Sequence, residues 1–402
     1  MHIAGVICEY NPFHTGHAWQ LAELRRRGAD GIVCVMSGNF VQRGDFALLR
    51  KHVRAEAAVR GGADLVLELP LPWATASAEG FARGGVEVLA ATGVVDTLAF
   101  GSECADTNAL VRVAQALCAT EFPAALREEI LRGDSFAAAR QRAAERLCGA
   151  DAEILGNPND ILGVEYCKAL RAQASAIVPL ALPRVGAAHD AAAADAYASA
   201  SFLRERILES DTADGCDAWS RYVTADMLRL YAAERAAGRA PVRMETMERA
   251  VLTRLRAMTE ADFAAFDEGG EGVYHRFFDA ARKATGIGAL LDAVKTKRYA
   301  HARLRRFLLS CYLGVFPAQR RIDVPYIRVL AMGDKGKDLL HEMRRTSKLP
   351  VLIRPTDVKK LTESAKNLLE TEARATDLYA LAYPDLAQSA GGSEWTTNPV
   401  IV

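Results

Sequence analysis

The sequence predicts an α/β protein with a doubly wound parallel sheet, followed by a mainly helical C-terminal region. In the first half, short apolar segments alternate with segments of helical length, which is typical of parallel strands joined by crossover helices. These apolar segments lack a strict polar–apolar alternation, as expected for strands that helices cover on both faces. In the second half, helical segments predominate.

The predicted elements of the first half follow one another at short spacing. The expected strands are 3–9, 31–37, 64–69, 95–100 and 177–183. The expected helices are 16–28, 47–61, 77–92, 106–119, 124–132, 135–148 and 160–173. Ligands of such sheets bind at the carboxyl ends of the strands, near the point where strand order reverses. Residues that directly follow these strands are therefore the candidate site residues.

The second half has a different pattern. We divide the chain into a catalytic domain at 1–215 and a mainly helical region at 216–402, which is expected to end in a flexible tail because its last residues are rich in Gly, Ser and Thr. The helices expected there are 217–237, 244–257, 259–267, 271–284, 287–297, 299–313 and 359–371, interrupted by strand-like segments at 326–332 and 350–355. The first domain holds 20 Lys and Arg against 27 Asp and Glu, and the second holds 30 against 23. This asymmetry indicates either a polyanion-binding second half or an uneven distribution of solvated charges.

Composition indicates a cytoplasmic protein. The eight cysteines include no C-x-x-C pair, which is typical of a reduced intracellular chain. The N-terminal segment has no basic stretch of a signal peptide, and no apolar run reaches the length of a membrane helix. We therefore expect no membrane association, while the oligomeric state stays open.

Two histidines mark the junction between the first strand and the first helix. His14 and His17 lie three residues apart, so they share one face of the first helical turn, with Gly16 between them. Free N–H groups and partial positive charge at a helix N-terminus favour phosphate binding. Imidazoles beside it can donate hydrogen bonds to phosphate oxygens during nucleotidyl transfer. The pattern therefore predicts phosphate chemistry at this junction.

Two other interpretations of the histidines were weighed. They could simply cap the helix or pack against it, or they could form a metal-binding pair. No Cys or His nearby completes a four-coordinate metal site, so the sequence predicts no dedicated metal centre. The coincidence of the motif with a strand–helix junction favours phosphate binding.

Beyond the histidines, several segments carry a family resemblance. The segment HTGH resembles the H-x-G-H signature of the nucleotidylyltransferase superfamily. Together, six segments between residue 2 and about residue 350 resemble the tRNA(Met) cytidine acetate ligase family: GVICEYNPFHTGH, MSGNFVQRGDFALL, GADLVLELP, FGSE, NPNDILGVEYCKAL and KRYAHARLRRFLL. The resemblance implies a Rossmann-like nucleotidylyltransferase (HUP) fold.

The resemblance also implies a reaction. Members of that family use ATP to activate acetate as acetyl-adenylate with release of pyrophosphate. They then acetylate N4 of the wobble cytidine of elongator tRNA(Met). The implied substrates are therefore ATP, acetate and this tRNA, with Mg²⁺ expected to arrive bound to ATP.

The family's ATP-binding positions map onto this chain residue by residue. The first stretch comprises Ile7, Cys8, Glu9, Tyr10, Asn11, Pro12, Phe13, His14, Thr15, Gly16, His17, Ala18, Trp19 and Gln20. Further positions correspond to Gly101, Asn159, Arg184 and the adjacent Val185. The chain departs from the family pattern at Asp160, where a second asparagine is common, and at the segment AAHD.

Other polar residues complete the predicted site. Arg43 lies between two glycines after the second strand. We expect it to hold acetate or pyrophosphate and to be a catalytic residue together with His14 and His17. The alternative is that Arg43 only caps a turn. Ser199, Ser201 and Arg204 resemble the superfamily's second signature and are candidate triphosphate ligands, although they equally fit an ordinary helix cap.

The window 295–307 is the candidate RNA-binding segment. It contains no acidic residue, and its basic side chains alternate with aromatic ones. This combination suits contact with RNA phosphates and stacking on bases. The alternative is a solvated basic face of a packed helix. The residues expected to bind RNA are Lys295, Lys297, Arg298, Tyr299, Arg303, Arg305 and Arg306.

Two rival functions share some of these features. An adenylyltransferase acting on a small phosphorylated cofactor precursor needs the histidines but not the long basic helical region. A non-catalytic RNA-binding protein with a vestigial nucleotide site disagrees with the intact motif of His14, Gly16 and His17. No side chain stands out as the base for acyl transfer.

Overall fold

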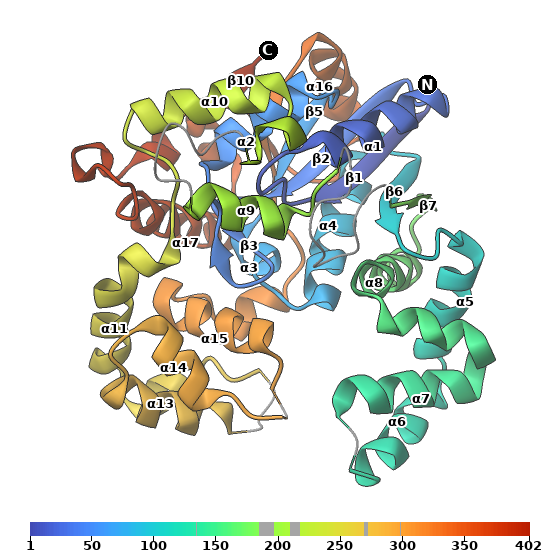
Figure 1. Cartoon of the computed structure of the whole chain (residues 1–402). Helices are drawn as coiled ribbons and strands as arrows, with labels where there is room; N and C mark the ends of the chain where they lie inside the picture. The colour runs from blue at the N-terminus through green and yellow to red at the C-terminus, as the bar shows by residue number, and fades with distance from the viewer. Residues whose placement is uncertain (134, 185–196, 210–217, 269–271, 298) are drawn as a thin grey trace.

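The structure is a computed structural model of the chain, shown in Figure 1. It describes residues 1–133, 135–184, 197–209, 218–268, 272–297 and 299–402. A central sheet with helices on both faces forms the upper part of the molecule in this view. A helical lobe and a separate helical arm extend below it.

The central sheet contains eight strands in the order β10-β8-β5-β2-β1-β6-β7, with β9 paired to β8. Their bounds are β1 Ile3–Cys8, β2 Gly31–Ser37, β5 Leu65–Leu69, β6 Thr97–Ser102, β7 Val178–Pro183, β8 Ile327–Met332, β9 Val351–Leu352 and β10 Val400–Ile401. All pairs are parallel except β5 with β8. The chain leaves β1 towards β2 and β5, then returns to its other side through β6 and β7. Strand order therefore reverses between β1 and β6.

Helices cover both faces of most of the sheet, which explains why its strands are mainly apolar and lack a strict polar–apolar alternation. In β1, Ile3 and Ile7 face one core cluster, whereas Ala4, Val6 and Cys8 face the other. The first face is covered by α3 Leu71–Ala74, α4 Ala78–Thr92, α8 Pro158–Ala172, α16 Asp334–Thr346 and α17 Glu363–Ala380. The second face is covered by α1 Thr15–Arg26, α2 Lys51–Arg60, α9 Ala200–Glu209 and α10 Ala225–Ala236. This is the doubly wound arrangement that the sequence predicts.

A third core cluster lies in the helical lobe. The lobe contains α11 Glu248–Ala257, α12 Glu260–Ala264, α13 Val273–Lys283, α14 Ile287–Val294 and α15 His301–Leu313. A two-stranded antiparallel ribbon, β3 Phe40–Val41 and β4 Asp45–Phe46, packs its phenylalanines into this cluster. The arm on the opposite side consists of α5 Thr107–Leu117, α6 Phe122–Leu131 and α7 Phe136–Cys148.

Short 3-10 helices connect several of these elements. They are η1 Gly149–Gly156, η3 Ser220–Tyr222, η4 Met244–Met247, η5 Pro317–Arg320, η6 Pro355–Lys360, η7 Leu386–Gln388 and η8 Ser393–Trp395. Taken alone, none of the helices in the described ranges is long and apolar enough to cross a membrane. One pair, α5 with α6, passes that test only when joined across a bend of 80°.

The sheet extends beyond the division proposed at residue 215. The segment 326–332 forms β8, which pairs with β5, and β9 and β10 pair with β8 in turn. The segment from β8 onward therefore returns to the sheet of the first half. The tail that was expected to be flexible is part of this return, because it contributes β10 and the buried Glu394. The lobe is thus an excursion from the sheet within the mainly helical second half.

Candidate active site

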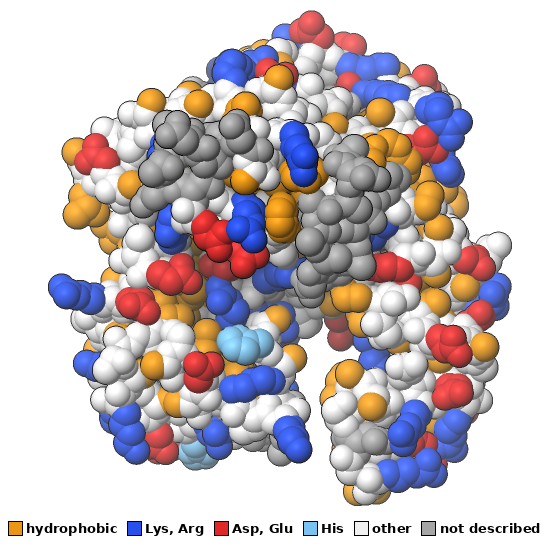
Figure 2. Space-filling model, in the orientation of Figure 1, with side chains coloured by type: hydrophobic (Ala, Val, Ile, Leu, Met, Phe, Trp, Pro, Cys, Tyr) orange, Lys and Arg blue, Asp and Glu red, His pale blue; other side chains and the backbone are white. Residues whose placement is uncertain are grey.

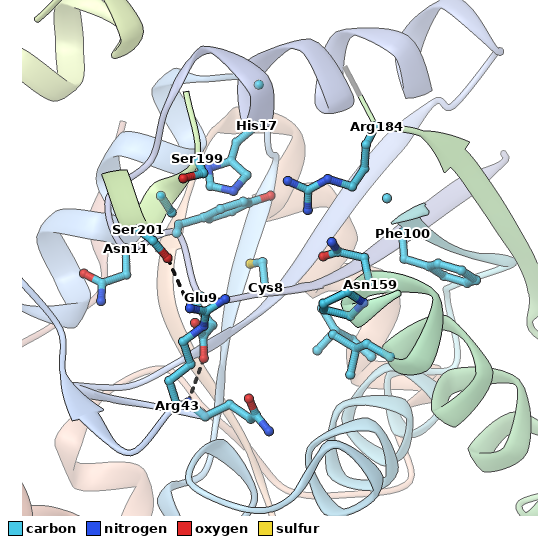
Figure 3. Close-up of a pocket in the computed structure, with 18 of the residues that line it drawn as sticks. Cys8, Glu9, Asn11, His17, Arg43, Phe100, Asn159, Arg184, Ser199 and Ser201 are labelled. Atoms are coloured by element: carbon cyan, nitrogen blue, oxygen red, sulfur yellow. Dashed lines mark hydrogen bonds between the residues drawn. The ribbon is translucent and has the colours of Figure 1, made fainter. Parts of the chain in front are cut away.

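A cavity of about 780 Å³ opens where the strand order reverses, at the carboxyl ends of β1, β6 and β7 (Figure 3). Its wall combines the loop after β1, the start of α1, the start of α8, the start of α9 and part of α15. The first stretch predicted to bind ATP contributes Ile7, Cys8, Glu9, Tyr10, Asn11, His14, Gly16, His17, Trp19 and Gln20. Its other members, Pro12, Phe13, Thr15 and Ala18, are not among the lining residues.

His14 is the N-cap of α1, and its ring stacks on that of His17. The ring centroids lie 3.6 Å apart, and the planes are inclined by 24°. Nδ1 of His14 accepts a hydrogen bond from the Gly16 N–H at 3.0 Å, and Nδ1 of His17 accepts one from the His14 N–H at 3.3 Å. Because Nδ1 is an acceptor in both rings, each neutral ring carries its proton on Nε2. The pair therefore offers two N–H donors to a ligand.

Gly16 is required by the fold of this cap. A Cβ atom at position 16 would lie 2.9 Å from Cε1 and 3.1 Å from Nδ1 of His14. Any side chain there would push the histidine ring away from the helix terminus. The glycine therefore sets the position of His14.

Both histidines are kept neutral at physiological pH. Burial, together with the positive charges of Arg184 and Arg204, lowers the pKa of His14 to about 3. Burial and the neighbouring His14 lower the pKa of His17 well below its ordinary value. The neutral histidines can therefore serve as hydrogen-bond donors, and the positive charge of the cavity comes from the arginines around them.

Five arginines line the cavity within the described residues: Arg43, Arg184, Arg204, Arg305 and Arg306. Ser201 connects two of them, since its Oγ accepts from Arg43 Nη1 at 3.1 Å and from Arg204 Nη2 at 3.0 Å. Arg204 Nη1 also donates to the Asn11 carbonyl at 2.9 Å. The two arginines and the serine thus form one connected group, and Ser199 starts the same helix by accepting from the Phe202 N–H.

The opposite wall is made by β6 and α8. A Cβ at Gly101 would approach Arg184 Cγ to 3.3 Å, so the glycine leaves space beside that arginine. Asn159 Nδ2 donates to Glu103 Oε1 at 2.5 Å, which fixes the amide at the start of α8. Asp160 is fully buried and accepts from Ser102 Oγ at 2.5 Å and from the Glu103 N–H at 2.9 Å. Asp160 therefore supports the wall that Asn159 and Gly101 contribute.

Arg54 in α2 holds the loops of the site in place. Its guanidinium is completely buried and donates to the carbonyls of Ser37 and Leu49, each at 3.0 Å. It also donates to the carbonyls of Glu9 and Gly38. One side chain thus connects the ends of β1 and β2 and the segment before α2. Sequence reasoning missed this residue, because nothing in a helical KHVRAEAAVR segment distinguishes a buried arginine from a solvated one.

Several lining residues were also absent from the sequence-based prediction. They include Val6, Asp45, Ala78, Phe81, Phe100, Pro158, Ile161, Leu162, Tyr166, Leu182, Pro183, Ala200 and Ala302. Phe100 and Tyr166, with ring centroids 5.4 Å apart, provide an apolar surface next to Gly101. Val185 and Arg298, predicted to bind ATP and RNA respectively, lie outside the described residues.

The candidate RNA-binding window divides into three groups. Arg305 and Arg306 line the cavity itself, whereas Lys295 and Lys297 are exposed outside it. Tyr299 is only 4% exposed and packs in the core of the lobe, with the Arg303 guanidinium 5.3 Å from its ring centroid. The stacking role expected for Tyr299 is therefore wrong, because its ring is not accessible to a base.

The fold and this site define a nucleotidyltransferase with a histidine pair at the first strand–helix junction. In agreement, residues 1–394 match the family described as HIGH Nucleotidyl Transferase. A tRNA(Met) cytidine acetate ligase of Acetivibrio thermocellus is 37% identical over the whole of both chains. A protein of the same name from Caldanaerobacter subterraneus is 36% identical over 97% of each chain.

Solved structures agree with the sequence relatives. The crystal structure of Thermotoga maritima TmcAL bound with alpha-thio ATP superposes with a TM-score of 0.92 at 32% identity, covering both chains completely. The apo form of that protein gives a TM-score of 0.94 with the same identity and coverage. The chain therefore belongs to the tRNA(Met) cytidine acetate ligase family.

Proposed function

We propose that this protein activates acetate with ATP and transfers the acetyl group to N4 of the wobble cytidine of elongator tRNA(Met). One observation carries the proposal: a single cavity at the strand-order reversal contains His14, His17 and five arginines. The match to ligases of that name over their whole length supports the choice of substrates. These substrates place the reaction in the cytoplasm.

In the first step, a carboxylate oxygen of acetate forms a bond to the α-phosphorus of ATP. The bond from this phosphorus to the bridging oxygen breaks, and pyrophosphate leaves with the electron pair. The Nε2–H groups of His14 and His17 donate hydrogen bonds to phosphate oxygens as negative charge develops on them. The group of Arg43, Ser201 and Arg204 holds the departing phosphates in line.

In the second step, N4 of cytosine bonds to the acetyl carbon of acetyl-adenylate. The bond from that carbon to the adenylate oxygen breaks, AMP leaves, and the amine releases one proton. The adenylate is a reactive mixed anhydride, so the protein contributes chiefly by positioning the amine against it.

Mg²⁺ is proposed to arrive with ATP, where it would offset the negative charge of the phosphates. In the described part of the chain, no group of three or more His, Cys, Asp or Glu side chains could hold a metal ion. Mg²⁺ commonly uses one or two carboxylates together with phosphates and water, so such a group is not required. Glu9 at the end of β1 lines the cavity and would provide one carboxylate.

The anticodon arm is proposed to enter from the side of the helical lobe. Figure 2 shows Lys and Arg side chains on this lobe, beside a hollow that separates it from the arm of α6 and α7. Lys295, Lys297 and Arg303 would contact the RNA backbone there. In this assignment, residues 1–215 bind ATP, the returning strands complete the sheet, and the lobe within 216–402 binds RNA.

The proposal is tested with purified protein, ATP, radiolabelled acetate and total tRNA. Pyrophosphate release and labelled acetylcytidine are expected with the wild type and lost in His17→Ala. Pyrophosphate release without labelled tRNA would contradict the RNA substrate and favour the rival reaction with a small phosphorylated precursor. Absence of both signals from folded protein would contradict the ligase function itself.

A further inference from the structure

One wall of the cavity is formed by segments that lie 260 residues apart in the chain. Gly44, at φ +77°, turns the β3–β4 ribbon, and a Cβ there would lie 2.5 Å from the Arg306 backbone nitrogen. The glycine therefore lets the ribbon contact the backbone of α15 directly. Arg306 Nη1 also donates to the Gln42 carbonyl at 3.4 Å. Ribbon and helix thus form one continuous surface.

Asp45 and Arg305 meet on that surface. Asp45 Oδ2 accepts from Arg305 Nη2 at 2.5 Å, and Asp45 Oδ1 accepts from the Phe46 N–H at 2.8 Å. Both side chains line the cavity and retain exposure, 36% for Asp45 and 24% for Arg305. The contacts of Arg305 within the described structure use Nη2, to Asp45 and to the sulfur of Met244. Its Nε and Nη1 groups are therefore available to a ligand.

We propose that Asp45 and Arg305 bind the Watson–Crick edge of the acceptor cytosine. The Asp45 carboxylate accepts a hydrogen bond from the N4 amine, and one N–H group of the Arg305 guanidinium donates to N3. An acceptor beside a donor reproduces the O6 and N1–H groups of guanine, the natural partner of cytosine. Uracil would place its O4 acceptor against the carboxylate, so the pair would exclude it. This inference rests on the proposed function.

The position of the pair agrees with two substrates in one cavity. Asp45 and Arg305 lie on the lobe side, whereas His14 and His17 lie at the start of α1. The volume of about 780 Å³ is in the upper part of the roughly 300–1,000 Å³ range of pockets that enclose one small ligand. A nucleotide at the histidines thus leaves room for a base at the ribbon.

The same carboxylate can receive the proton of the transfer step. Of the described residues, only Glu9 and Asp45 bring carboxylates to the cavity lining, and the histidines are too weakly basic to serve. Burial raises the pKa of Asp45 while Arg305 opposes that rise, with Glu245 and Arg204 also nearby. As the new N4–carbon bond forms and AMP leaves, Asp45 accepts the amine proton and later returns it to solvent.

The test uses the full-length protein and two anticodon stem-loop RNAs that differ only by C or U at the wobble position. Affinity for both RNAs is measured in the presence of a non-hydrolysable ATP analogue. Wild type is expected to prefer the C-containing RNA by roughly 5- to 150-fold, the value of one good base-edge contact. In Asp45→Ala this preference should disappear. Glu245→Gln, which removes a nearby negative charge outside the cavity lining, should keep it.

Acetate-dependent ATP–pyrophosphate exchange separates this inference from the function on which it rests. In Asp45→Ala and Asp45→Asn, the rate of acetyl transfer should fall at least tenfold more than the rate of pyrophosphate exchange. Asp45→Asn retains an acceptor oxygen, so it should bind RNA better than Asp45→Ala yet transfer slowly. An unchanged preference for C, or an equal loss of exchange and transfer, would overturn the inference. Wild type that acetylates no RNA would instead refute the proposed function.

Discussion

Lys51 in α2 and Glu394 near the C-terminus form an ion pair in the interior, although 343 residues separate them in the chain. Lys51 Nζ lies 2.6 Å from an oxygen of Glu394 and 2.6 Å from one of Glu68 in β5. Arg328 in β8 completes the group by pairing with Glu394. All of these side chains are at most 9% exposed. The cluster thus connects the C-terminal segment to the middle of the sheet.

Glu394→Gln is expected to destabilise the protein by about 3 kcal/mol, because it leaves Lys51 and Arg328 with fewer negative partners in a buried site. Urea denaturation followed by circular dichroism measures the change. Glu363→Gln, on a side chain that is 83% exposed, is the matched control and should cost less than about 1 kcal/mol. Equal effects of the two substitutions would show that the buried cluster adds nothing to stability.

His17→Asn should lower the rate of acetate-dependent pyrophosphate exchange by about a hundredfold or more, the loss typical of a donor to a developing oxyanion. Binding of ATP should change much less, because the arginines still hold its phosphates. Exchange kinetics and ATP titration separate the two effects. His275→Ala, in the exposed part of α13, should behave like wild type.

Arg54→Lys should lower the exchange rate by roughly tenfold to a hundredfold, since a lysine cannot reach the four carbonyls that the guanidinium joins. The segments that Arg54 joins would then shift relative to one another. Arg60→Lys, at the exposed end of the same helix, should leave the rate unchanged. If Arg54→Lys retained full activity with unaltered stability, its positioning role would be refuted.

Acid should destabilise the protein through two partly buried histidines that stay neutral in the folded state. His14 and His52 each have a folded-state pKa of about 3, below the ordinary value of 6.5. Below pH 6.5 the unfolded chain binds protons that the folded chain excludes, so stability is lost as the pH falls. From pH 6.5 to 5 the loss should be about 2 kcal/mol per histidine. The free energy of unfolding of wild type and of His52→Gln is measured at both pH values. The variant should lose about 2 kcal/mol less than wild type between pH 6.5 and pH 5.

Substituting two exposed lysines of the lobe should weaken RNA binding through electrostatics. With Lys295→Gln and Lys297→Gln combined, the slope of log affinity against log salt should become shallower by about 1 to 2. Filter binding at several salt concentrations gives this slope. The matched double variant is Lys335→Gln with Lys337→Gln in α16, at the opposite end of the molecule from α15 (Figure 1). An identical slope change in both variants would remove the lobe from the RNA-binding surface.

The sequence was sufficient for the local features of the site. The five predicted strands of the first half match β1, β2, β5, β6 and β7 within two residues at each end. The two histidines lie at the junction of β1 and α1, as predicted, and His14 is the N-cap of α1, which the sequence left as an alternative. These features depend on short-range periodicity and on capping chemistry, which neighbouring residues determine.

Long-range features were not accessible in the same way. Asp45 and Arg305 are 260 residues apart, and only the tertiary fold brings them into contact. No local sequence pattern predicts this contact. Tyr299 was misread because an aromatic residue among basic ones fits both a stacking surface and an amphipathic helix, and burial decides between them. Likewise, β8 is a short apolar segment whose antiparallel place beside β5 depends on a return of the chain after the lobe.

The return of the chain to the sheet has a mechanical consequence. The lobe begins after α10, which packs against one face of the sheet, and it ends before β8, which is hydrogen-bonded within the sheet. The lobe is therefore attached to the sheet at both ends, instead of by a single connection. Two attachments restrict rotation of the lobe relative to the sheet. The contact of the β3–β4 ribbon with α15 restricts it further. RNA would therefore bind to a surface of the lobe whose position relative to the sheet is fixed before binding.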